Sequence, residues 1–114
     1  MAQEKRRFDR FDTLHLSCVQ VGKDDSVIFE GMGRTLNVSK GGILLEIVSD
    51  QSLSGHIILR IALEGDLIVL SGNIVHCDSK GLRLYHAGIE FLKMSEKAAM
   101  ILDKFIKVFE ERSS

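Results

Sequence analysis

Arginines gather near the amino terminus of this chain, in residues 5–10 (KRRFDR). A guanidinium can donate paired hydrogen bonds to phosphate oxygens or to the O6/N7 edge of guanine, and its flat face can stack on a base. The spacing Arg6-x-x-x-Arg10, with Arg7 beside it, therefore favours a ligand that carries both phosphate and a base. A solubilising charged tail is the simpler alternative for these residues.

A polar turn rich in glycine follows at residues 37–42 (NVSKGG). The side chains of Asn37 and Ser39 can donate and accept hydrogen bonds at the edge of a heterocycle. The pair Gly41 and Gly42 allows a ligand to approach the backbone closely. This turn is our second candidate for a binding segment, and an ordinary hairpin loop is the alternative.

Signs of catalysis or metal binding are weak. The turn around Ser39 is not a G-x-S-x-G nucleophile elbow, since Asn37 occupies the first position, and it lacks the order of a phosphate-binding P-loop. The four histidines fall on different apolar runs without the spacing of a metal site: His15, His56, His76 and His86. We therefore expect a protein that is not an enzyme and that holds neither a metal nor a cofactor.

Length and charge narrow the function classes further. The chain has 114 residues, enough for one domain, and a formal net charge of −1. Residues 1–10 hold four basic and two acidic side chains, which leaves 11 basic against 14 acidic side chains in the remainder. This balance disfavours a protein that binds nucleic acid through a broad basic surface. No apolar stretch is long enough for a transmembrane helix or a signal peptide, so we expect a cytoplasmic protein.

Short apolar runs separated by glycines and polar turns predict a meander of β-strands. The expected strands cover residues 13–21, 27–37, 42–48, 57–63, 67–77 and 82–92, with residues 78–81 as a turn before the last one. In the first strand, alternation predicts Leu14, Leu16 and Cys18 on one buried face. Cys18 and Cys77 show no CxxC spacing, so we interpret both as reduced thiols in the core.

The pattern changes to helical spacing after Met94. Ser95 is a good N-cap, and apolar residues then recur on one helical face: Ala98, Ile101, Leu102, Phe105 and Phe109. We expect a helix over about residues 95–110. Six strands and one helix predict an all-β fold, a small antiparallel barrel with the terminal helix over its open end or flank. Residues 1–12 lie outside this pattern as a flexible arm of the single domain 13–114.

The two candidate segments together resemble the paired signature of the PilZ family, R-x-x-x-R and [D/N]-x-S-x-x-G. Arg6 and Arg10 match the first motif, and Asn37, Ser39 and Gly42 match the second. Residues 87–91 (AGIEF) look like the late G-x-x-F strand of that family. The resemblance extends over nearly the whole chain.

This resemblance implies a six-stranded split barrel with a carboxy-terminal helix that binds the bacterial second messenger cyclic di-GMP. In the family the two arginines grip guanine edges, stack on bases and neutralise phosphates, and Arg7 matches a frequent third arginine. The loop that contains Asn37, Ser39 and the glycines Gly41 and Gly42 holds a guanine. Asn in place of Asp lacks a carboxylate for the guanine N–H donors, so its amide oxygen must accept them. Ligand binding would order the arm onto the barrel and change a surface that an unidentified downstream protein recognises.

Two alternatives stay open from the sequence. One is a PilZ-like adaptor of pilus or flagellar assembly that binds no nucleotide, although such members usually lack the arginine motif. The other is a small nucleic-acid-binding protein that uses residues 5–10 as a basic anchor. The acidic character of the remaining residues argues against it.

If the chain is instead the cyclic di-GMP receptor that the resemblance implies, we expect a stand-alone receptor that acts in motility or biofilm regulation. It would be a monomer or homodimer, with no DNA, RNA or membrane as partner.

Overall fold

The computed structural model describes residues 16–23, 25–63 and 65–113. The predicted arm, with Arg6, Arg7 and Arg10, lies outside these described residues. The elements along the chain are β1 (Leu16–Lys23), β2 (Ser26–Val38), β3 (Gly42–Val48), β4 (Gly55–Leu63), β5 (Asp66–Gly81), β6 (Leu84–Phe91) and α2 (Glu96–Ser113).

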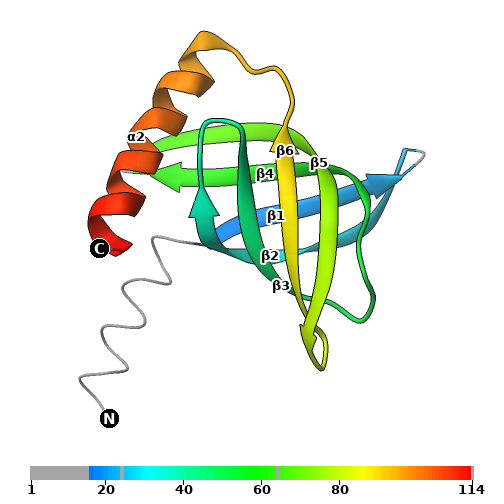
Figure 1. The fold of residues 1–114 in the computed structure, drawn as a ribbon. Helices are drawn as coiled ribbons and strands as arrows, with labels where there is room; N and C mark the ends of the chain where they lie inside the picture. Colours follow the sequence, from blue (N-terminus) through cyan, green and yellow to red (C-terminus); the bar gives the residue numbers. More distant parts are fainter. Residues whose placement is uncertain (1–15, 24, 64, 114) are drawn as a thin grey trace.

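The strands close into a barrel in the order β1-β2-β3-β6-β5-β4, and every neighbouring pair is antiparallel. Since β4 pairs with both β5 and β1, the sheet has no free edge along these strands, and closure removes the usual route to edge-to-edge aggregation. The predicted six-stranded antiparallel barrel with a terminal helix is confirmed (Figure 1).

The core is aliphatic inside the barrel and aromatic where the helix meets it. Inward side chains such as Leu45, Ile57 and Leu70 are at most 1% exposed. Helix α2 adds Phe105 and Phe109, whose ring centroids lie 6.3 Å apart. Figure 1 shows this helix beside one end of the barrel, next to the connection between β2 and β3. The helix therefore closes that end with its apolar face.

The start of α2 follows the sequence prediction. The backbone N–H of Ala98 donates to Oγ of Ser95 at 3.1 Å, which is the contact expected of an N-cap serine. The helix continues to Ser113, three residues beyond the expected end. Helix ends without a glycine or proline signal are the least defined feature of a helical pattern, and none follows Glu110 here.

The buried face of β1 is the opposite of the predicted one. Val19 and Val21 point into the core and are at most 1% exposed, whereas Cys18 is exposed. Both alternating sets of this strand contain apolar residues, and a choice between them changes the face of every side chain. Pairing of Val19 with Leu59 on β4 settles the register. Cys18 and Cys77 are free, as expected, but Cys18 is not a core thiol and Cys77 is half-buried.

The turn predicted at residues 78–81 is also wrong, because these residues continue β5. The connection to β6 is Leu82 and Arg83, and Arg83 has a φ of 62°. Leu82 has no positive φ, and the pairing of β5 with β6 shifts register between Ser79 and Gly81 just before this connection. The last residues of β5 are exposed, so their polar side chains give no sign that they form a strand.

Candidate functional site

The site residues predicted on the barrel lie together at the connection between β2 and β3. Asn37 is the next-to-last residue of β2, and Gly42 is the first residue of β3. Leu36 forms a β-bulge, because Thr35 pairs with Leu45 whereas Asn37 pairs with Leu44. A bulge places an extra residue on one strand and re-aims the side chains beside it. Asn37 and Ser39 are consequently both exposed.

Hydrogen bonds inside the loop fix its shape. The N–H of Val38 donates to Oδ1 of Asn37 at 3.0 Å, and the N–H of Gly41 donates to Oγ of Ser39 at 3.3 Å. The N–H of Ser39 donates to the carbonyl oxygen of Gly42 at 2.9 Å, which closes the turn. A carbonyl oxygen has a second lone pair, so Oδ1 of Asn37 can still accept a bond from a ligand. The loop thus presents polar atoms in a preformed arrangement.

The two glycines of the loop have different roles. A Cβ on Gly42 would collide with the carbonyl oxygen of Ile89, whereas a Cβ on Gly41 would meet nothing within 4 Å. The N–H of Phe91 donates to the carbonyl oxygen of Gly41 at 2.9 Å. Gly42 therefore allows the loop to lie against β6, and the predicted close approach is made by the protein's own backbone. Gly41 leaves open space that a ligand can occupy.

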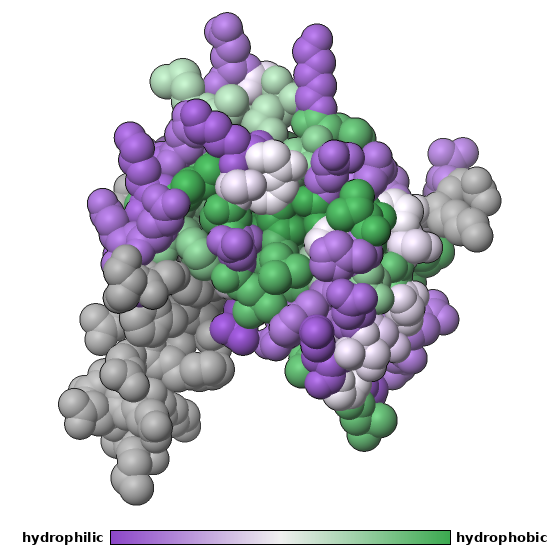
Figure 2. All heavy atoms as spheres, in the orientation of Figure 1, coloured by the Kyte–Doolittle hydropathy of each residue, from purple (hydrophilic) through white to green (hydrophobic). Residues whose placement is uncertain are grey.

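A groove of about 310 Å³ runs from this loop across the outer face of the barrel. Asn37, Ser39 and Leu44 line one part of it, and Gly88 and His76 line the other. Figure 2 shows hydrophobic surface in the middle of the molecule in this view, surrounded by hydrophilic side chains. A groove with an apolar floor and a few polar groups at its rim is the usual form of a small-molecule site.

A second hollow, of about 460 Å³, lies between the same loop and helix α2. Ser39 and Lys40 line it from the loop, and Asp103, Lys107 and Glu110 line it from the helix. Ser39 belongs to both hollows. A ligand that contacts Ser39 can therefore influence the helix as well as the barrel face.

Charged side chains form a row next to the groove. Arg34 on β2 donates to Oε1 of Glu46 on β3, with Nη2 at 2.9 Å. Nε2 of His86 on β6 lies 3.0 Å from Oε2 of the same carboxylate. Burial works to raise the pKa of Glu46, but the hydrogen bonds from His86 and Arg34 and their charges outweigh it and hold that pKa below the usual carboxyl value. The row joins β2, β3 and β6 beside the loop.

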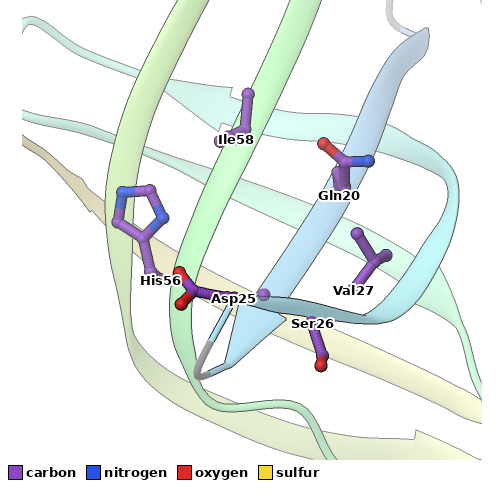
Figure 3. A pocket seen from close by; sticks show the side chains of 7 residues that line it. Gln20, Asp25, Ser26, Val27, His56 and Ile58 are labelled. Carbon is purple, nitrogen blue, oxygen red and sulfur yellow. The ribbon is translucent and has the colours of Figure 1, made fainter.

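A third hollow, of about 400 Å³, lies at the opposite end of β2 (Figure 3). Gln20, Asp25 and His56 line it, and Asp25 has a φ of 67°. None of the predicted site residues on the barrel contributes to it. The predicted ligand segment and this hollow are therefore separate features.

Comparison with known proteins identifies the fold family. A family model described as PilZ domain matches residues 4–107. The chain belongs to the PilZ domain family. Members of this family are generally cyclic di-GMP receptors, and PilZ is a binding domain, not a catalytic one. The family match includes the segment of Arg6, Arg7 and Arg10 as well as the loop of Asn37.

A solved structure shows the same PilZ fold. The crystal structure of the PilZ domain of CeSA from a cellulose-synthesizing bacterium superposes with a TM-score of 0.62 at 16% identity, over 84% of this chain and 92% of that one. No curated protein matches the sequence significantly. Within the described residues, no helix has the length and apolar character needed to cross a membrane.

Sequence reasoning missed the residues that β5 and β6 add to the groove, among them the polar side chain of His76. His76 lies far along the chain from Asn37, and the scattered histidines gave no reason to single it out. Only strand pairing brings β5 to the same face as the loop. Gly88, in the G-x-x-F pattern of residues 87–91, is the nearest feature in the sequence that points to this part of the groove.

Proposed function

We propose that this PilZ protein is a bacterial cytoplasmic receptor for cyclic di-GMP. The observation that carries the proposal is the loop of Asn37 and Ser39, which presents its polar atoms beside a groove with an apolar floor. The sequence places Arg6-x-x-x-Arg10 on the same chain, and the family is generally one of cyclic di-GMP receptors. The two motifs together supply donors for phosphate and for guanine.

The chemistry of the ligand suits these residues. Cyclic di-GMP carries two negative charges and two guanines, so Arg6 and Arg10 can meet phosphate oxygens, the O6/N7 edge and the flat face of a base. Arg7 adds a further positive charge. Oδ1 of Asn37 accepts from a guanine N–H through its remaining lone pair, and Gly41 leaves room for the base at the loop. Asn37 makes a neutral contact where an aspartate would make a charged one, so its effect on affinity is modest.

Binding fixes the arm of residues 1–12 over the groove. Ordering a backbone costs about 1–2 kcal/mol per residue. Base stacking contributes about 1–3 kcal/mol per base, and hydrogen bonds to charged groups contribute about 1.5–3 kcal/mol each. We expect a micromolar Kd, which corresponds to about −8 kcal/mol. Because the contacts are charged, the affinity falls as the salt concentration rises.

The output is a changed surface around the loop. A bound dianion neutralises the positive charge of the arm. The fixed arm covers part of the barrel face near α2. A downstream protein recognises this surface in one state only, as a population-shift mechanism requires. Lys40 and Lys107 line the second hollow, so their positive charges lie beside the surface that ligand binding changes.

Titration calorimetry with cyclic di-GMP tests the proposal. Wild-type protein gives a saturable heat at tens of micromolar, and Arg6→Ala and Arg10→Ala lose it while the melting temperature of the free protein stays unchanged. The matched control is Arg60→Ala, an exposed arginine on the outer face of β4, which binds like wild type. Absence of heat from the wild-type protein would contradict the proposal, and so would equal binding by all three variants.

A further inference from the structure

Strand pairing places His76 directly across the groove from the Asn37 loop. Asn37 pairs with Leu44, Leu44 pairs with Gly88, and Gly88 pairs with His76. These four residues form one row across β2, β3, β6 and β5. Three strand spacings of about 4.8 Å put the two ends of the row about 14 Å apart. Leu44 and Gly88 lie between these ends, and all four residues line the groove.

The ring of His76 lies over Gly88, where a side chain of residue 88 would otherwise stand. A Cβ on Gly88 would collide with Nε2 of His76, and it would lie 2.6 Å from Cδ2 and 2.7 Å from Cε1. Val75 has no partner on β6, since Ile74 pairs with Ile89 and His76 with Gly88. The bulge and the glycine together let the imidazole extend over β6 toward the floor of the groove.

Asp78 holds this ring in place. Oδ2 of Asp78 lies 3.2 Å from Nδ1 of His76, and both side chains are more than half exposed. A carboxylate beside one ring nitrogen favours one orientation of the imidazole. No described residue makes a hydrogen bond with Nε2. The ring is therefore positioned by the protein on one side and open to the groove on the other.

We propose that His76 is the second wall of the ligand groove and that a guanine of cyclic di-GMP stacks on its ring. This proposal rests on the proposed function and adds a contact from β5 that neither sequence motif contains. A flat ring is favourable there because stacking on an aromatic side chain binds a base through its face, whichever edge the loop holds. The base would lie above Leu44 and against the imidazole that covers Gly88, with Asn37 at its edge.

Calorimetry on matched histidine variants tests the contact. His76→Ala binds cyclic di-GMP about tenfold more weakly than wild type, whereas His76→Phe keeps a flat ring and binds within about twofold. His56→Ala is the control, because His56 is an exposed histidine in the separate hollow of Figure 3 and its loss leaves the affinity unchanged. Wild-type affinity in His76→Ala overturns the proposal, and so does equal weakening in His76→Ala and His76→Phe.

Two further measurements separate the possible failures. If the wild-type protein gives no heat, the proposed function fails, and the His76 contact with it. If the wild type binds, NMR of the unmodified protein reports on the contact without any variant: ligand shifts the imidazole resonances of His76 and leaves those of His56 in place. Unchanged His76 resonances on saturation show that binding does not use this wall. If His76→Ala melts at a lower temperature than wild type but binds cyclic di-GMP with the same affinity, the ring has a structural role only and the proposal is wrong.

Discussion

At the scale of single residues, Gly42 carries the strongest constraint in the loop. Its missing side chain leaves space for the carbonyl oxygen of Ile89, a backbone atom that cannot rotate away. We predict that Gly42→Ala lowers the free energy of unfolding by about 1–3 kcal/mol, the usual effect of forcing extra volume into a packed site. Chemical denaturation measures the change.

The neighbouring glycine is the control for that prediction. Gly41 has open space around its Cβ position, so Gly41→Ala leaves stability within about 0.5 kcal/mol of wild type. Equal stability of the two variants would mean that the loop moves freely away from β6. In that case the bond between Phe91 and Gly41 would not hold the loop in place.

Glu46 gives a residue-scale prediction on pH. His86 and Arg34 hold its folded-state pKa below the usual value despite burial. A group whose folded pKa is lowered contributes stability above its unfolded pKa, about 4.3, and this contribution is lost as the pH falls through the folded pKa. Between pH 6 and pH 3, wild-type protein therefore loses more unfolding free energy than Glu46→Gln. Denaturation at several pH values tests this, with Glu30→Gln on the exposed part of β2 following the wild-type curve.

At the scale of elements, α2 is held to the barrel by its aromatic side chains. Phe105 is 1% exposed and lies next to Phe109, whereas Met100 on the same helix is 71% exposed. We predict that Phe105→Ala lowers the free energy of unfolding by about 3–5 kcal/mol and that Met100→Ala changes it by less than about 0.5 kcal/mol. Thermal melts followed by circular dichroism compare the two. A small effect of Phe105→Ala would show that the barrel is stable without the helix.

At the scale of the whole molecule, ligand binding and folding are linked. A ligand that binds only the folded state at one hundred times its Kd raises the free energy of unfolding by about 2.7 kcal/mol. We therefore predict a clear rise in melting temperature with cyclic di-GMP. Cyclic di-AMP, which has the same charge but adenines, should give no rise at the same concentration. Equal shifts with both would mean that the site recognises phosphates without reading the base.

Much of this architecture follows from the residues in sequence order. Alternating apolar residues between glycine turns indicated six strands, and Ser95 with the spacing of Leu102, Phe105 and Phe109 indicated the helix, because these signals act over a few neighbouring residues. The sequence-based predictions were wrong where the local pattern of residues is compatible with two different structures. Both faces of β1 have apolar residues, and the exposed end of β5 has the polarity of a turn.

The composition of the binding loop follows from the amino-acid sequence alone, since residues 37–42 are contiguous and the types of their side chains define the hydrogen bonds they can make. The residue that lies across the groove from that loop is defined by the tertiary structure. His76 reaches the groove through three successive strand pairings, and its ring fits there because Gly88 has no side chain. Contacts between residues distant in sequence depend on barrel closure and register, which are set by the packing of all six strands together. Loop chemistry is therefore local information, whereas the shape of the groove is a property of the closed barrel.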